Sequence, residues 1–202
     1  IPVVIVGRRI NVDSFSNVAT DNYLAGVMAG EYLGSIGHKR VATITGPRIT
    51  QWARDRLDGF RDGLAKYQAQ LEWQYSQTDL PDFETGLAAS EALMADYAGR
   101  ALPTAIWAQN DIMAAAVLKS LTKRGYRVPE DVSLLGMDDI QLCTMVTPTL
   151  STIHQPLREI AQESIRIIME NEPGAEPQPR RVILTPTLQV RESTAPPNPA
   201  AD

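Results

Sequence analysis

Two similar stretches decide the fold: Thr104-Ala105-Ile106-Trp107-Ala108-Gln109-Asn110-Asp111 and Val132-Ser133-Leu134-Leu135-Gly136-Met137-Asp138-Asp139. Each is a short apolar run that ends in polar residues. Between them, Ala114, Val117, Leu118 and Leu121 recur at the spacing of one helix face. A strand, a helix and a second strand in this order predict a unit of parallel sheet.

The same alternation extends over most of the chain. Seven strands are expected, at residues 3–6, 41–45, 71–75, 104–108, 132–135, 151–154 and 181–190. Amphipathic stretches between them predict helices, the last of which carries Leu157, Ile160, Ala161, Ile165 and Ile168 on one face. The order predicts an α/β fold with mostly parallel sheets flanked by helices.

Composition and charge exclude several classes of protein. Hydrophobic residues make up 44% of the chain and charged residues 21%, which is ordinary for a globular domain and too apolar for a disordered one. No apolar run reaches the roughly 18 residues of a membrane span. The formal net charge of −5 gives no general attraction to DNA phosphates. The single Cys143 and the distant His38 and His154 offer neither a disulfide framework nor a local zinc motif.

Motifs that would indicate an enzyme are missing. The sequence has no glycine-rich dinucleotide-binding or phosphate-binding loop, no G-x-S-x-G elbow and no H-E-x-x-H zinc motif. An enzyme that uses Asp138 or Asp139 as a general base is an alternative, but no motif supplies its nucleophile, metal or cofactor. We therefore expect a binding protein without a cofactor or a metal.

Polar residues follow three of the expected strands at their carboxyl ends: Asn110, Asp138 and Gln155. Ligands of open α/β sheets collect at this edge. An amide both donates and accepts hydrogen bonds, and a carboxylate accepts two, a mixture that suits a sugar better than an anion. The alternative is that Asn110 and Asp111 only cap a helix and that Asp138 and Asp139 only form a turn.

Two arginines, Arg54 and Arg56, lie in the first turn of the expected helix that follows Pro47. The helix dipole disfavours a cation there, so one of them is expected to have a partner. Arg56 is placed to face the cleft and to grip two hydroxyls or pair with Asp138. The alternative is an ordinary surface arginine.

Two aromatic residues, Trp52 and Phe83, precede helices in expected loops. Aromatic rings at a cleft stack on the apolar face of a sugar or a base. Alternatively, either ring forms a lid over the core.

Taken in order, these motifs resemble the effector-binding core of the LacI/GalR family of bacterial transcription regulators. The resemblance covers nearly the whole chain, and its fold is the two-lobed type I periplasmic-binding-protein fold with parallel sheets flanked by helices. It rests on TDNY at 20–23, GHKRVATITGP at 37–47, RLDGF at 56–60, PTAI at 103–106 with NDIMA at 110–114, VPEDVSLLGMDD at 128–139, LSTI at 150–153 and LQVRES at 188–193.

The resemblance implies effector contacts at individual positions. They are Arg56 in the helix that opens the second lobe, Asn110 in the N-D pair, Asp138 in the G-x-D-D turn, Phe83 as an aromatic platform, Gln155 as a hydrogen-bonding residue, Trp52 at a variable specificity position, and, as a looser match, Arg8 or Arg9 facing the cleft from the other lobe.

The resemblance also implies a division of the chain. Residues 1–47 and 152–172 are expected to form the remainder of an N-terminal lobe, residues 48–151 and 180–195 the C-terminal lobe, and residues 196–202 a disordered tail. The family's helix-turn-helix DNA-binding domain, its hinge and the first strand–helix units of lobe one have no counterpart in this sequence. The first lobe is therefore expected to be incomplete.

The function implied is that of a cytoplasmic sensor. A small molecule, a sugar or sugar phosphate, would bind between the lobes and control DNA binding allosterically. The implied partners are this effector, operator DNA through the missing N-terminal domain, and a second copy in a homodimer, with no membrane. The alternative is an extracytoplasmic sugar-binding protein of a transport system, which has the same fold and cleft.

Overall fold

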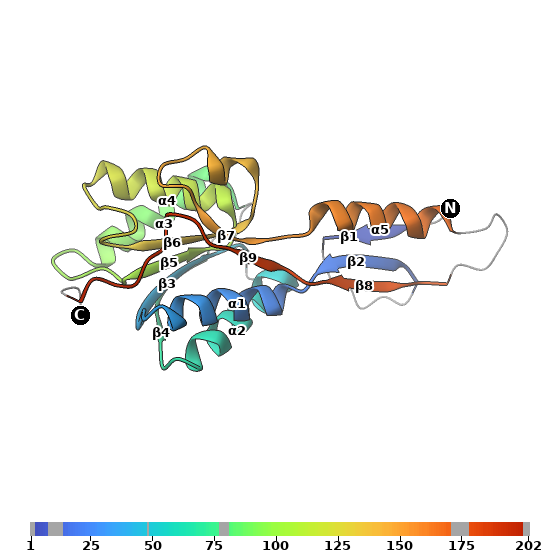
Figure 1. The fold of residues 1–202 in the computed structure, drawn as a ribbon, viewed down its shortest axis with the longest axis horizontal. Helices are drawn as coiled ribbons and strands as arrows, with labels where there is room; N and C mark the ends of the chain where they lie inside the picture. The colour runs from blue at the N-terminus through green and yellow to red at the C-terminus, as the bar shows by residue number, and fades with distance from the viewer. Residues whose placement is uncertain (1–2, 8–13, 48, 77–80, 171–177, 200–202) are drawn as a thin grey trace.

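The computed structural model describes residues 3–7, 14–47, 49–76, 81–170 and 178–199. Two sheets follow one another along the long axis of the molecule (Figure 1). The large sheet has the strand order β4-β3-β5-β6-β7-β9, with β3 at Arg40–Thr45, β4 at Gln70–Ser76, β5 at Ala105–Ala108, β6 at Ser133–Asp138, β7 at Ser151–His154 and β9 at Thr187–Gln189. All its strand pairs are parallel except the antiparallel pair of β7 and β9. The predicted α/β class is confirmed.

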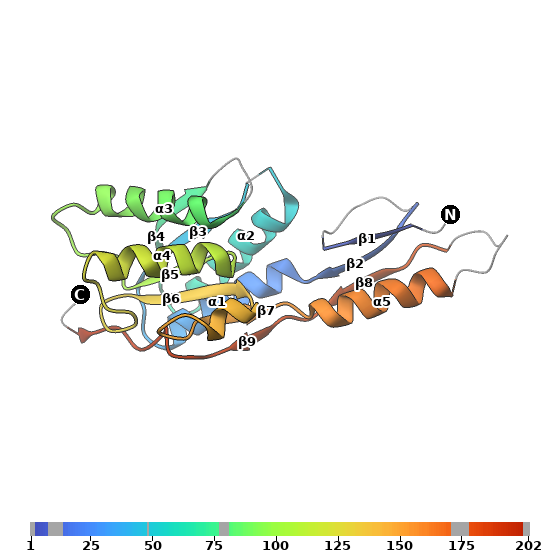
Figure 2. The ribbon, with the colours of Figure 1, turned by 90° about the horizontal axis from the view of Figure 1, so that it is seen from above.

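Helices cover both faces of the large sheet (Figures 1 and 2). The helices α1 (Asn22–Ser35) and α2 (Gln51–Ala65) lie on one face, and α3 (Phe83–Asp96) and α4 (Asp111–Lys123) lie on the other. The strands are consequently apolar on both sides. Trp107 of β5 packs on Phe60 of α2 with ring centroids 4.6 Å apart, whereas Ile106 joins the cluster on the opposite face. A short 3₁₀ helix, η1 (Gln141–Thr144), follows β6.

The small sheet consists of three parallel strands in the order β1-β2-β8, with β1 at Val4–Val6, β2 at Ser16–Thr20 and β8 at Arg181–Leu184. The helix α5 (Leu157–Met169) covers one of its faces and packs Ile160 and Ile167 against Val18. Among the residues that the structure describes, no helix combines the length and apolarity that crossing a bilayer requires.

The chain passes between the two sheets three times. It does so between β2 and α1, between β7 and α5, and between β8 and β9, as Figure 2 shows from above. We call the small sheet with α5 the small lobe, and the large sheet with α1–α4 the large lobe. The three connections lie together at the junction of the lobes, so a change in lobe orientation acts on all three.

The expected division of the chain differs from these sheets. β3 and β7 pair within the large sheet, whereas residues 40–47 and 152–154 were assigned to the N-terminal lobe. The single strand expected at 181–190 is two strands in different sheets, and only β8 belongs to the small one. The reason is that periodicity identifies strands but not their neighbours in a sheet.

Two local predictions were also wrong. On α5 the buried residues are Ile160, Ser164 and Ile167, whereas Leu157 and Ile165 are exposed, so the face turned to the sheet is rotated from the predicted one. Residues 196–199 were expected to be disordered, but the structure places Pro197 against Gly37, which ends the turn after α1 with φ of +107°. Residues 200–202 lie outside the described part.

Glycines bring α1 and α2 into backbone contact. A Cβ atom at Gly26 of α1 would lie 2.1 Å from the carbonyl oxygen of Arg56, and one at Gly59 of α2 would lie 2.0 Å from that of Tyr23. Both distances are far below van der Waals contact, so only glycine permits this approach. The approach sets Asn22, at the start of α1, beside the first turns of α2.

We expect Gly59→Ala to lower the free energy of unfolding by about 1–3 kcal/mol, since overpacking outweighs the helix propensity gained. Urea denaturation measures this change. The exposed neighbour Asp58 provides the control, because Asp58→Ala adds no such contact. A Gly59→Ala protein as stable as the parent would show that the helices separate at no cost.

Candidate functional site

The candidate site lies where the carboxyl ends of β5, β6 and β7 meet the end of β2. Asp138 is the last residue of β6, and Gln155 follows β7 directly. Thr20, the last residue of β2, donates a hydrogen bond from Oγ1 to Gln155 Oε1 (2.8 Å), and Gln155 Nε2 donates to Asp138 Oδ1 (2.5 Å). Gln155 thus links the two lobes.

Asp138 keeps one carboxylate oxygen for a ligand. Its Oδ1 accepts from Gln155, whereas Oδ2 has no hydrogen bond within the described residues. Burial raises the pKa of Asp138 to about 6, although the positive charge of Arg56 and the Gln155 hydrogen bond oppose the rise. The carboxylate is therefore mostly ionised at neutral pH and accepts hydrogen bonds.

Arg56 is buried on α2, with 6% of its surface exposed. Its Nε donates to Asn22 Oδ1 and its Nη1 to the carbonyl oxygen of Gln109, both at 2.8 Å. The guanidinium lies 5.0 Å from the ring centroid of Trp52. Burial lowers its pKa to about 10, which leaves it protonated at neutral pH.

The remaining nitrogen of Arg56, Nη2, makes no hydrogen bond to any described residue. The partners of Arg56 within the described residues are thus Asn22 and the backbone of Gln109, and not Asp138 as suggested from the sequence. Exposed Arg54 instead bonds residues of its own segment, among them the carbonyl oxygen of Ile49.

The other predicted residues have contacts of their own or lie outside the described part of the chain. Asn110 caps α4, because its Oδ1 accepts from Met113 N (2.7 Å), and its Nδ2 donates to Pro81 O (2.7 Å). The capping alternative thus describes its contacts, and an effector contact stays a prediction. Phe83 starts α3, with Lys119 Nζ 5.5 Å from its ring centroid. Arg8 and Arg9 lie outside the described residues.

Sequence reasoning missed three members of the site: Thr20, Asn22 and Gln109. Thr20 and Asn22 belong to the TDNY motif, in which the sequence indicated only that Asp21 caps a helix. The side chain of Asp21 does accept a hydrogen bond from Leu24 N. Their role became visible only with β2, a strand too polar to be expected. The buried side chain of Gln109 is exceptional, because neither amide atom has a hydrogen-bond partner in the described part of the chain.

We expect Gln109→Met to raise the free energy of unfolding by about 1–2 kcal/mol, because it removes a buried amide without partners and keeps the volume. Urea denaturation of the ligand-free protein tests this. The matched control is Gln51→Met, since Gln51 is exposed and its amide bonds Asp55. Loss of stability in Gln109→Met would mean that the amide is satisfied in solution.

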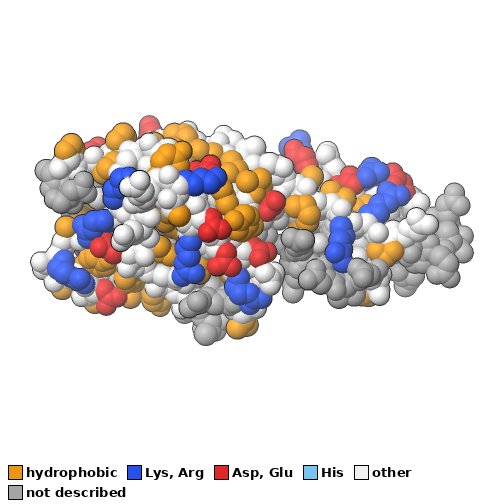
Figure 3. Space-filling view, turned by 90° about the horizontal axis from the view of Figure 1, so that it is seen from below, with side chains coloured by type: hydrophobic (Ala, Val, Ile, Leu, Met, Phe, Trp, Pro, Cys, Tyr) orange, Lys and Arg blue, Asp and Glu red, His pale blue; other side chains and the backbone are white. Residues whose placement is uncertain are grey.

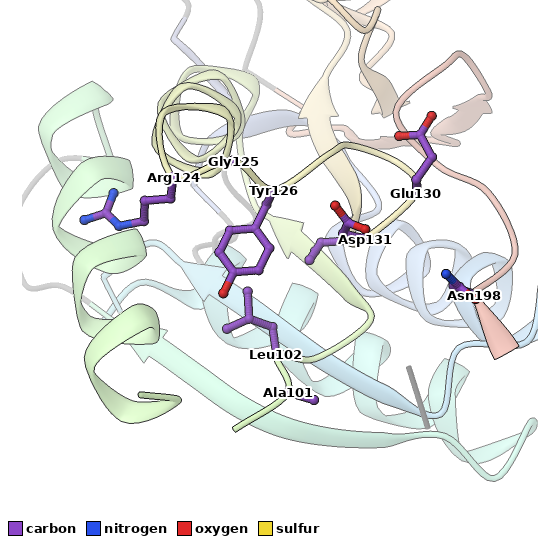
Figure 4. Close-up of a pocket in the computed structure, with 9 residues that line it drawn as sticks. Ala101, Leu102, Arg124, Gly125, Tyr126, Glu130, Asp131 and Asn198 are labelled. Atoms are coloured by element: carbon purple, nitrogen blue, oxygen red, sulfur yellow. The ribbon is translucent and has the colours of Figure 1, made fainter. Parts of the chain in front are cut away.

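Of two hollows in the described part of the chain, one reaches this group and the other lies away from it. One, of about 260 Å³, adjoins the site and is lined by Thr20, Asp21, Asn22, Tyr23, Asp55 and Ile183. The other, of about 420 Å³, lies at the opposite ends of β5 and β6, around Leu102 and Tyr126 (Figure 4). Its Arg124 and Asp131 already pair with Glu91 and Arg127, respectively.

Two properties of the surroundings limit the kind of ligand that fits the site: the charges nearby and the arrangement of residues that could bind a metal ion. Acidic and basic side chains are interspersed on the face of α1 and α2 (Figure 3), where α2 contributes Asp55, Asp58 and Asp62 beside Arg54 and Arg61. Within the described residues, no group of three or more histidines, cysteines and acidic residues is arranged to hold a metal ion. The hydrogen-bonding groups of the site match hydroxyl groups, which both donate and accept.

Comparison with known proteins identifies the family. Residues 31–194 match the model of the periplasmic binding protein-like domain. The chain is 30% identical over 198 residues to the HTH-type transcriptional regulator DegA of Bacillus subtilis (98% of this chain, 58% of that protein). It is 35% identical over 182 residues to the ribose operon repressor of Escherichia coli K12 (90% and 54%). The chain thus spans little more than half the length of these relatives.

The solved structures that resemble this chain include transcriptional regulators, as the sequence relatives do. A LacI family transcriptional regulator from Enterococcus faecium with bound ribose superposes with a TM-score of 0.84 at 27% identity, over 96% of this chain and 71% of that one. A complex of the transcriptional regulator CelR with cellobiose gives a TM-score of 0.77 at 32% identity, over 94% and 58%. The chain belongs to the periplasmic binding protein-like domain family, and its relatives within that family are LacI-family transcriptional regulators.

Proposed function

We propose that this chain is the effector-sensing domain of a LacI-family transcriptional regulator and that a sugar or sugar phosphate binds at the junction of its lobes. One observation carries the proposal: buried Arg56 and partly exposed Asp138 each keep one hydrogen-bonding atom, Nη2 and Oδ2, without a partner among the described residues. One donates and the other accepts, as two sugar hydroxyls require. Trp52 and Phe83 supply rings for stacking, Asn110 and Gln155 orient hydroxyls, and Arg8 contributes a further contact.

The site lies where ligand binding acts on lobe orientation. An effector that contacts both lobes favours their closed arrangement, because it gains contacts only there. In the intact regulator, which we propose to be a cytoplasmic homodimer with a separate DNA-binding domain, closure shifts the affinity for operator DNA. The relatives named above are regulators, which supports this role over that of a transport receptor and over catalysis.

Isothermal calorimetry with D-ribose, ribose 5-phosphate and cellobiose tests the proposal. These probes cover a monosaccharide, its phosphate and a disaccharide, and two of them occur with the related structures. We expect saturable binding of at least one probe, and binding weakened about 10-fold to 100-fold in Asp138→Ala. Binding of no sugar, or equal affinity in Asp138→Ala, would contradict the proposed site.

A further inference from the structure

The turn that presents Asp138 has an unfavourable backbone. Asp138 has φ of +120° and Asp139 has φ of +60°. Side chains rarely adopt positive φ, and two consecutive non-glycine residues there persist only when the surroundings hold them. The position of the Asp138 carboxylate therefore depends on what holds this turn.

Arg191 holds the turn from the next segment of chain. Its Nη2 donates to Asp139 Oδ1 (2.6 Å), and its Nη1 donates to the carbonyl oxygen of Leu150 (2.8 Å). Its backbone N–H donates to Ser151 Oγ (2.9 Å). The guanidinium thus ties the turn to the start of β7. Both partners of the ion pair are mostly buried, with exposed side-chain fractions of 22% for Arg191 and 17% for Asp139.

Two further contacts complete the support. His154 Nδ1 lies 3.0 Å from the other carboxylate oxygen of Asp139. Buried Asp111 accepts the N–H of Ile140 at 3.0 Å through Oδ2, while its Oδ1 accepts from Thr152 Oγ1 at 2.7 Å. The turn is thereby fixed on both sides of Asp139.

One of the connections between the lobes, that of β7 and α5, bonds this turn directly through Gln155. Thr20, the last residue of β2 before the β2–α1 connection, bonds Gln155, which bonds Asp138. Gln155 belongs to the β7–α5 connection and directly follows His154, the last residue of β7. Arg191 follows β9, which the β8–β9 connection leads into. A change in lobe orientation therefore acts on the turn that carries the Asp138 carboxylate.

We propose that Arg191 is a positioning residue for the effector, which holds the Asp138 carboxylate in its ligand-facing place through the ion pair with Asp139. This inference rests on the proposed function, because it assigns Arg191 a part in the same site. Arg191 acts without touching the effector. Its loss lets the turn relax toward negative φ and moves the carboxylate.

Calorimetry with the probe sugar that binds the parent chain measures the effect. We expect Arg191→Gln to weaken binding about 10-fold and Arg191→Lys to restore part of it, since lysine keeps the charge but cannot bond Asp139 and Leu150 in the same fork. The matched control is Arg127→Gln, which removes an ion pair with Asp131 away from the turn. Should Arg191→Gln not fold, Asp139→Asn weakens the same pair with less change in shape.

A second measurement separates positioning from general stability. In an Asp138→Ala background, Arg191→Gln should change affinity less than twofold, because the group it positions is gone. A full 10-fold loss in that background, or no loss in the parent background, overturns the proposal.

A third measurement needs no ligand. The amide resonances of Asp138 and Ile140 should shift in Arg191→Gln and stay in place in Arg127→Gln. Unshifted resonances overturn the inference whether or not sugars bind. If no probe sugar binds the parent while these resonances shift, the proposed function fails for those sugars and the positioning of the turn by Arg191 stands.

Discussion

Replacing Arg56 by alanine is expected to weaken effector binding by at least about 100-fold and to lower the free energy of unfolding by about 2–4 kcal/mol. The change removes the donor that faces the ligand. It also leaves Asn22 Oδ1 and the carbonyl oxygen of Gln109 without their charged partner in a buried place. Finally, it removes the cation that opposes protonation of Asp138.

Two further variants serve as comparisons for Arg56→Ala. Arg56→Lys keeps the positive charge but replaces the three nitrogens of the guanidinium by a single amine. We therefore expect a free energy of unfolding near that of the parent and sugar binding still weakened about 10-fold. Arg54→Ala, an exposed arginine two residues earlier, is expected to change neither property. Calorimetry and urea denaturation measure both. An Arg56→Ala protein that binds sugar as the parent does would remove Arg56 from the site.

The Arg56 environment shows what the sequence could and could not predict. The dipole argument predicted that one first-turn arginine has a partner, and both its position in the helix and the family resemblance favoured Arg56. Neither identified Asn22, because that contact depends on the backbone approach of α1 and α2 at Gly26 and Gly59. A pattern of small residues on two helices does not state which helices pair.

The strand-end argument was more successful. Parallel strands place their carboxyl ends at one edge, so Asn110, Asp138 and Gln155 were expected together. Asp138 and Gln155 bond each other, whereas Asn110 bonds Met113 and Pro81. The missing partner was Thr20, since β2 is the polar run Ser16–Thr20, all of it buried. Polar strands of this kind are stabilised by pairing with a strand on each side, here β1 and β8. The spacing of apolar residues along the sequence does not reveal such pairing.

Stability and ligand affinity are expected to change in opposite directions in Asp138→Asn. Between about pH 4 and 6, the folded protein holds a proton on Asp138 that the unfolded chain has released, because burial raises the pKa from 3.8 to about 6. The free energy of unfolding therefore falls as pH rises through this window, by at most about 3 kcal/mol at 1.4 kcal/mol per pH unit. Asparagine carries no such proton, so the variant should be about 1–3 kcal/mol more stable than the parent at pH 7.5 and equally stable near pH 4.

Urea denaturation of parent and variant at pH 4, 5, 6 and 7.5 tests the sign, and their difference isolates Asp138 from other titrating groups. The control is Asp58→Asn, an exposed carboxylate of α2. Sugar affinity should fall about 10-fold to 100-fold in Asp138→Asn, because an ionised acceptor is stronger than an amide. The parent should also bind more tightly as pH rises through about 6, the reverse of its stability. Parallel pH profiles of stability in parent and variant would contradict the raised pKa. If the free energy of unfolding falls while sugar affinity rises with pH, the ionised carboxylate destabilises the ligand-free protein and is retained because it binds the ligand.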